Sequence, residues 1–101
     1  MKKIIIDTSQ IGKVVVKLKV QSANFKEEKQ QKFGSQVLLS MIEEILKKAG
    51  LEMKDLDEIQ VHTGPGSFTG LRVGVAVANA LGFGLGIPVN GKKVETKIRY
   101  T

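Results

Sequence analysis

Residues 63–72, Thr-Gly-Pro-Gly-Ser-Phe-Thr-Gly-Leu-Arg, decide how this 101-residue chain folds. An alternating apolar run at 59–61 precedes this stretch, and a segment rich in small apolar residues, 73–86, follows it. This order predicts a strand, a tight glycine loop and a helix, with backbone N–H groups gathered at the helix N-terminus. We expect Ser67 to cap that helix and Pro65 to stiffen the loop, whose glycines allow positive φ or close backbone approach.

Length and composition indicate one small domain that can bury a modest core without cross-links. The chain has no cysteine, which excludes a disulfide framework and a thiolate metal site. Its formal net charge of +6 fits an RNA partner, an acidic protein partner or a solubilising surface. Because the lysines are spread from Lys2 to Lys97 with few aromatic residues among them, we favour the solubilising surface.

Hydrophobic periodicity predicts the element order βββαβαβ. Strands are expected at 3–7, 14–20, 25–32, 59–61 and 87–89. The strand at 25–32 is highly charged, which suits a sheet edge, where Lys and Glu discourage pairing with another molecule. A helix with a broad apolar face should begin at Gly34-Ser35 and end near Ala49, closed by Gly50. A short turn at 54–57 then leads into the fourth strand.

The segment from Val73 to Gly91 carries no charged residue and approaches the length of a membrane span. Asn79, Pro88 and several glycines interrupt it, and the capped loop before it belongs to a soluble α/β pattern. We therefore expect a helix that is buried nearly all round, and no membrane contact. Only three isoleucines follow Met1-Lys2-Lys3, so we expect no secretory segment and a cytoplasmic chain.

Several segments, in order along the chain, resemble one known family. The string from Gly64 to Val89, GPGSFTGLRVGVAVANALGFGLGIPV, resembles the signature of the TsaB (YeaZ) family in the actin-like ATPase superfamily. Residues 4–9, Ile-Ile-Ile-Asp-Thr-Ser, resemble its opening strand and turn, and residues 35–57 resemble its first helix and following turn. The resemblance implies a non-catalytic partner of TsaD in the bacterial synthesis of threonylcarbamoyladenosine at position 37 of tRNAs.

The resemblance also implies the fold class, which is α/β: a single actin-like (ribonuclease H-like) lobe, a mixed sheet with two helices. Residues 1–90 are similar to the N-terminal lobe of the family, whose complete members carry a second lobe, and residues 91–101 diverge from its pattern. Asn90-Gly91 is a strong hairpin signal, and apolar residues alternate from Val94 to Tyr100 behind it. We expect this tail to add an antiparallel strand on the strand at 87–89, with a frayed tail as the alternative.

Two segments are candidates for phosphate or nucleotide contact. In actin-like ATPases an acidic residue on the first strand lies near the metal-bound phosphates, and the resemblance gives Asp7-Thr8-Ser9 the corresponding turn. The alternative, which we favour without a second lobe to clamp an adenosine, is that Asp7 and Thr8 satisfy turn amides. The candidate signature and phosphate-contacting residues are Asp7, Thr8, Ser9, Gly64, Pro65, Gly66, Ser67, Thr69 and Gly70.

We expect no catalytic residue, no metal site and no cofactor. The related catalytic subunit TsaD carries a His-x-x-x-His metal motif after the strand that corresponds to 87–89, and residues 91–101 hold no histidine. His62, the single histidine, lacks companion ligands and is interpreted as a polar residue near the loop. Ser67 has no Ser/His/Asp set around it, so helix capping is the simpler account. The chain is predicted to be a non-enzyme.

The predicted second helix carries a small residue every fourth position, which allows close approach of another helix or of the sheet. These positions are Gly70, Gly74, Ala78 and Gly82. The resemblance implies that both helices meet those of TsaD in a helical bundle. The candidate interface residues are Val37, Leu38, Met41, Ile45, Gly74, Val75, Ala78, Asn79, Gly82 and Phe83. The alternative is that some of them pack on the chain's own sheet.

Three classes of function stay open. The leading hypothesis is a scaffold subunit for tRNA modification that binds a TsaD-like protein or a second copy of itself, and contacts tRNA only through that complex. The second is a small phosphate- or nucleotide-binding module that uses Asp7, Thr8 and the loop from Gly64 to Gly70. The third is direct RNA binding through the lysines, which predicts steep weakening with salt.

Overall fold

A computed structural model describes residues 1–21, 23–29 and 35–93 of the chain. Within these ranges the elements follow the predicted order, with the turn before the fourth strand formed as a short 3₁₀ helix. The elements are β1 (Lys2–Asp7), β2 (Val14–Val20), β3 (Ala23–Lys29), α1 (Ser35–Lys48), η1 (Met53–Asp55), β4 (Glu58–Val61) and α2 (Phe68–Leu85).

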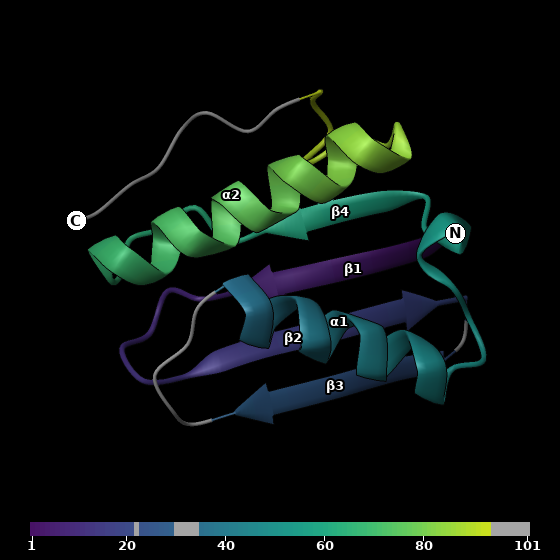
Figure 1. The fold of residues 1–101 in the computed structure, drawn as a ribbon, viewed down its shortest axis with the longest axis horizontal. Helices are drawn as coiled ribbons and strands as arrows, with labels where there is room; N and C mark the ends of the chain where they lie inside the picture. The colour runs from purple at the N-terminus through teal and green to yellow at the C-terminus, as the bar shows by residue number, and fades with distance from the viewer. Residues whose placement is uncertain (22, 30–34, 94–101) are drawn as a thin grey trace.

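The strands form one four-stranded mixed sheet in the order β3-β2-β1-β4. β2 pairs antiparallel with both β1 and β3, whereas β4 pairs parallel with β1. The parallel pair needs a crossover, and α1 supplies it between β3 and β4. Figure 1 shows both helices on the same face of the sheet, so no helix of the described residues covers the opposite face. The α/β fold with a mixed sheet and two helices is confirmed.

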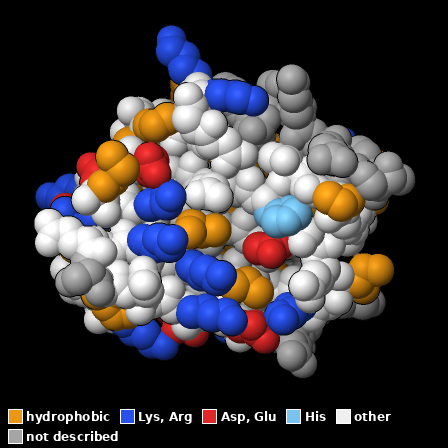
Figure 2. Space-filling model, turned by 180° about the vertical axis from the view of Figure 1, so that it is seen from behind, with side chains coloured by type: hydrophobic (Ala, Val, Ile, Leu, Met, Phe, Trp, Pro, Cys, Tyr) orange, Lys and Arg blue, Asp and Glu red, His pale blue; other side chains and the backbone are white. Residues whose placement is uncertain are grey.

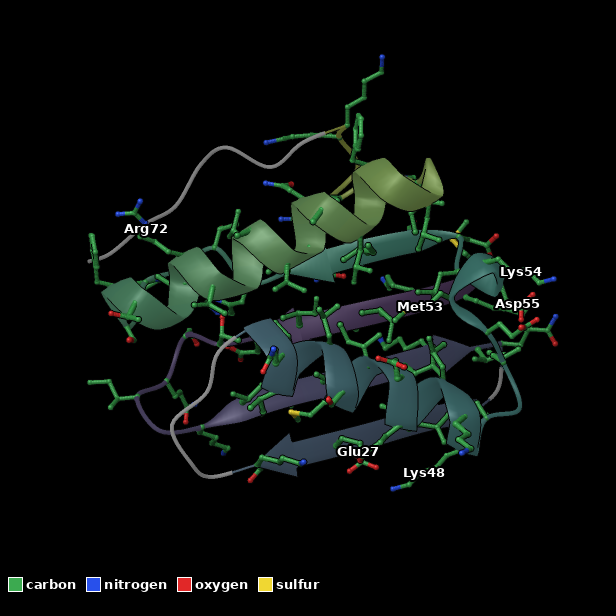
Figure 3. All side chains as sticks on the ribbon, in the orientation of Figure 1. Glu27, Lys48, Met53, Lys54, Asp55 and Arg72 are labelled. Atoms are coloured by element: carbon green, nitrogen blue, oxygen red, sulfur yellow. The ribbon has the colours of Figure 1, made fainter. Side chains whose placement is uncertain are left out.

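The core lies between the sheet and the two helices. Alternate residues of β1 and β2 point into it, and Ile4, Ile6 and Leu18 are fully buried. α1 contributes the apolar face that its periodicity predicts, while Glu43, Glu44, Lys47 and Lys48 are exposed. The buried residues of α1 are Leu38, Met41, Ile42, Ile45 and Leu46. Lys48, in the last turn of α1, forms an ion pair with Glu27 of β3 (Figure 3).

α2 begins and ends as its sequence predicts. Ser67 is the N-cap, and its hydroxyl oxygen accepts a hydrogen bond from the Gly70 amide at 3.3 Å. Gly86 ends the helix in the left-handed conformation. The small-residue stripe faces the molecule's own sheet and the segment after the helix: a Cβ on Gly74 would overlap the Thr8 hydroxyl, and one on Gly82 would meet Val89. The stripe therefore allows close packing within the chain.

The expected fifth strand at 87–89 is wrong as a strand, because Val89 alone of these residues forms β-bridges in the described part of the chain. Val89 bridges Ile59 of β4 in parallel, and the Asn90 side chain continues the contact, with its Oδ1 2.8 Å from the Val61 amide nitrogen. Pro88 has no N–H to donate to a ladder, and Asn90 and Gly91 turn the chain at once, with φ of 52° and 77°.

That turn is the hairpin that Asn90-Gly91 predicts, because Val89 and Lys92 form an antiparallel bridge across it. The proposed tail strand from Val94 to Tyr100 lies outside the described residues, as do residues 30–32 of the expected third strand. β3 accordingly is described from Ala23 to Lys29. The division of the chain into a lobe and a divergent tail stays a prediction.

By length and composition alone, α2 passes the test for a membrane-spanning helix, with a mean hydropathy of 1.4 over its 18 residues. The core helix of a soluble domain passes the same test. Here the helix packs on β1, β4 and α1, and its buried positions face that core. The expectation of a helix buried nearly all round is corrected, because α2 covers the sheet with one side only and leaves Phe68, Ala76, Ala80 and Phe83 exposed.

Candidate functional site

The loop after β4 and the turn after β1 lock together at one end of the sheet. The Ser9 carbonyl accepts a hydrogen bond from the Ser67 amide at 2.7 Å, and the Thr8 hydroxyl donates to the Gly70 carbonyl at 2.6 Å. Gly66 is required here because a Cβ would collide with the Ser9 backbone. The first turn of α2 is thus joined to the β1 turn by bonds between residues about sixty positions apart in sequence.

Asp7 organises its own turn. Its Oδ1 accepts from the Ser9 amide at 2.9 Å and from the Ser9 hydroxyl at 2.6 Å, which is an Asx turn. Partial burial raises the pKa of Asp7. The two hydrogen bonds from Ser9 and the nearby His62 and Lys17 lower this pKa by more than burial raises it. The pKa of Asp7 therefore lies below its ordinary value of 3.8, and the carboxylate is charged at neutral pH.

The polar groups that the sequence marks for phosphate contact are engaged within the chain. Thr8 is fully buried, Ser67 caps α2, and the Nδ1 of His62 accepts a hydrogen bond from the Gly64 amide at 3.1 Å. Only Thr69 and Pro65 of this set are well exposed. The geometry agrees with the turn-satisfying interpretation of Asp7 and Thr8, and phosphate binding at this turn stays a prediction.

No set of groups for covalent chemistry comes together in the described part of the chain. Residues 1–21, 23–29 and 35–93 contain no cluster of three His, Asp or Glu side chains that could hold a metal ion. Ser67 and His62 each use their side chain to order the loop locally. The arrangement can position a loop and a helix end.

The candidate interface residues divide between core and surface, which corrects most of that set. Because the helices must cover the sheet, the members that lie on their inward sides are buried and cannot contact a partner in this conformation. These buried members are Leu38, Met41, Ile45, Gly74, Val75, Ala78 and Gly82. Val37 and Asn79 are half-buried, and Phe83 is 85% exposed.

Sequence reasoning missed the surface that the helices do present. A hollow of about 370 Å³ lies on the outer side of α1 and α2, and almost all of its lining is apolar. Its lining residues are Leu39, Ala76, Val77, Ala80 and Leu81. Ala76 and Ala80 repeat every fourth residue, two positions after Gly74 and Ala78, so they lie on the opposite side of α2. This second repeat of small residues could have predicted the exposed apolar surface from the sequence.

The N-terminal end of α2 is also exposed. The Arg72 guanidinium lies over the Phe68 ring, 5.3 Å from its centroid, and Phe68 is 56% exposed. Figure 3 shows Arg72 on the outer side of α2. Arg72 is thus exposed, and its contact is with an aromatic ring on the surface.

Comparison with known proteins agrees with the sequence and the fold. The protein-family model described as TsaD, tRNA N6-adenosine threonylcarbamoyltransferase, matches residues 26–92, more than half of the chain. A tRNA threonylcarbamoyladenosine biosynthesis protein TsaB of Haemophilus influenzae is 44% identical over 59 residues, which are 58% of this chain and 25% of that protein.

Solved structures of YeaZ and of a similar protein resemble this chain over more of its length. YeaZ from Pseudomonas aeruginosa superposes with a TM-score of 0.82 at 30% identity, over 88% of this chain and 43% of that one. An uncharacterized protein with similarity to peptidase YeaZ, also from P. aeruginosa, gives a TM-score of 0.81 at 30% identity, over 87% of this chain and 41% of that one. The chain thus matches less than half the length of these proteins.

Proposed function

The chain belongs to the TsaB (YeaZ) group of the TsaD family, and we propose that it is a non-catalytic binding subunit in tRNA threonylcarbamoyladenosine synthesis. In this proposal it acts in the cytoplasm and binds a TsaD-like protein through the outer side of α1 and α2. A second copy of the chain is the alternative occupant of the same surface. The tRNA position would be 37, as the resemblance implies.

The observation that carries the proposal is the apolar hollow between the exposed sides of the helices. Of its lining residues, Val77 is buried, Leu39 and Leu81 are half-buried, and Ala76 and Ala80 are exposed with little side chain. The two small exposed side chains let a partner helix approach closely and gain dispersion and hydrophobic contact. Phe83, on the same helix and 85% exposed, supplies an aromatic group of the kind that anchors interfaces.

The non-catalytic part of the proposal rests on how the polar groups are used. Asp7, Thr8 and Ser67 hold the turn and the helix end, and His62 orders the loop that contains Gly64. A group that is committed to a buried or capping hydrogen bond would have to break it before reacting. We therefore assign this end of the sheet a positioning role for α2, and give it no reaction.

The test is co-purification of the chain with the TsaD-like protein of the same cell, followed by measurement of the dissociation constant. Ala80→Glu places a charge in the lining of the hollow, and we expect it to weaken binding by roughly a hundredfold, because an unpaired charge buried by the partner costs several kcal/mol. Gln10→Glu is the matched control, since it adds the same charge to an exposed side chain in the turn after β1.

Three outcomes are informative. Loss of binding with Ala80→Glu and full binding with Gln10→Glu supports the proposal. Equal affinity for wild type and Ala80→Glu contradicts it, provided that both unfold at the same denaturant concentration. Sedimentation of the wild-type chain as a dimer that Ala80→Glu dissociates would assign the surface to a second copy and contradict the heterodimer.

A further inference from the structure

The sheet face without helices carries a stripe of lysines. Figure 2 shows blue side chains running across this face, and alternation along the strands identifies them. Lys17, Lys19 and Lys26 are exposed, and Lys3 and Lys13 are half-buried beside them. A hollow of about 310 Å³ lies among Lys13, Lys17 and Lys26, and its lining also includes the carboxylates of Asp7 and Glu28 and the side chains of Gln60 and His62.

The strand register places like charges directly opposite each other on this face. Lys17 of β2 is paired with Lys26 of β3, and Lys19 of β2 is paired with Lys3 of β1. Like charges at directly opposite positions destabilise a sheet. Three ion pairs offset part of the repulsion: Lys3 with Glu58, and both Lys13 and Lys26 with Glu28. The two neighbouring lysine pairs thus lower the stability of this face, and an anionic partner would reduce the repulsion between them.

We propose that this face binds the phosphate backbone of folded RNA through Lys3, Lys17, Lys19 and Lys26. The inference deepens the proposed function, on which it rests, by giving the chain a direct contact with tRNA on the face opposite the helices. One side of the sheet would then serve the protein partner and the other side the nucleic acid.

The composition of the face favours RNA backbone over an acidic protein. A protein interface needs an apolar centre, commonly with aromatic anchors. Ile5 and Val15 are the apolar residues here, both half-buried, and the described strands place no aromatic ring on this face. The lack of rings also disfavours stacking with single-stranded bases. Charge without an apolar centre is what binding to the phosphates of a folded RNA requires.

The experiment measures binding of the 101-residue chain to an unmodified tRNA transcript by fluorescence anisotropy, between about 50 and 200 mM salt. The test variant is Lys17→Gln with Lys19→Gln. The control is Lys47→Gln with Lys54→Gln, which removes the same charge from exposed lysines of α1 and η1. We expect the test variant to bind on the order of tenfold more weakly, with a salt slope that is smaller by about 2, and the control to keep the wild-type slope.

Several results would overturn the proposal: equal losses in the two variants, no binding by the wild-type chain at the lowest salt, or tighter binding to a poly-glutamate peptide than to RNA. The last result would assign the face to an acidic protein. Ala80→Glu separates this test from that of the proposed function. If this variant and the wild type both fail to bind the TsaD-like protein but still bind RNA, the lysine face is supported and only the helix docking is overturned.

Discussion

The two faces of the sheet use alternate residues of the same strands for opposite purposes. In β1, Ile4 and Ile6 are fully buried beneath the helices, whereas Lys3 and Asp7 lie on the open face with partial exposure. In β2, Leu18 is buried between the exposed Lys17 and Lys19. The covered face stabilises the domain by apolar burial, and the open face carries charge at some cost in repulsion. Alternate residues of the same strand thus stabilise the core and carry the surface charge.

The largest expected effect comes from breaking the close packing on the covered face. Gly74→Ala should lower the free energy of unfolding by about 2–4 kcal/mol, because the new methyl group displaces the Thr8 hydroxyl from its hydrogen bond. Gly84→Ala is the control, since nothing lies within 4 Å of its Cβ, and should raise stability by about 0.5–1 kcal/mol. Urea unfolding of both variants checks the pair. Equal shifts would show that α2 does not depend on this contact.

Thr8→Val removes the hydroxyl and keeps the shape. The Gly70 carbonyl then keeps only the helical bond expected from the Gly74 amide, so we expect a loss of about 0.5–1.5 kcal/mol in the free energy of unfolding. Thr69→Val, at an exposed position one residue before Gly70, should change stability by less than about 0.5 kcal/mol. A loss of similar size in both variants would point to the helix N-terminus in general and would contradict a special role for the buried bond.

On the open face, removing a side-chain charge is expected to increase the free energy of unfolding, whereas the substitutions on the covered face decrease it. Lys17→Gln relieves the repulsion with Lys26 and gives up only a small attraction to Asp7, so thermal or urea unfolding should show a net gain of about 0.2–1 kcal/mol. Lys47→Gln, on the solvent side of α1, should leave stability nearly unchanged. A destabilised Lys17→Gln variant would mean that this lysine is held by favourable contacts, and would remove the argument that the face is strained by like charge.

The smallest effect is that of pH on Asp7. Because its pKa is lower in the folded state, the carboxylate contributes stability above the unfolded-state pKa, and this contribution disappears as pH falls through the folded-state pKa. With solvent screening at this half-exposed site, the effect is on the order of a few tenths of a kcal/mol. The difference in unfolding free energy between wild type and Asp7→Asn should therefore shrink from pH 6 towards about pH 3. A constant difference would show that Asp7 acts only through its neutral hydrogen-bond geometry.

The predicted fifth strand shows how local rules can compete. Ile87-Pro88-Val89 reads as a short buried strand, and Val89 is indeed buried. Pro88 and the Asn90-Gly91 turn limit its pairing with β4 to one bridge, and the Asn90 side chain makes the next contact to β4 in place of a backbone. The hairpin signal in Asn90-Gly91 was in the sequence, whereas the use of its side chain as a strand extension depends on the distance to Val61.

Apart from the strand expected at 87–89, the sequence by itself determined the elements of this protein and, within a few residues, their ends. Period-two alternation in residues 14–20, the Ser67 cap and the closing glycines depend on the neighbours of each residue along the chain, and local rules are sufficient for them. Only the tertiary structure decided which apolar residues face the core and which face a partner. Met41 and Ala80 are both apolar helix residues, and whether each is covered depends on where the sheet and the other helix lie. The same is true of the lysine pairs, because residues 3, 17, 19 and 26 meet only once the strand register is set.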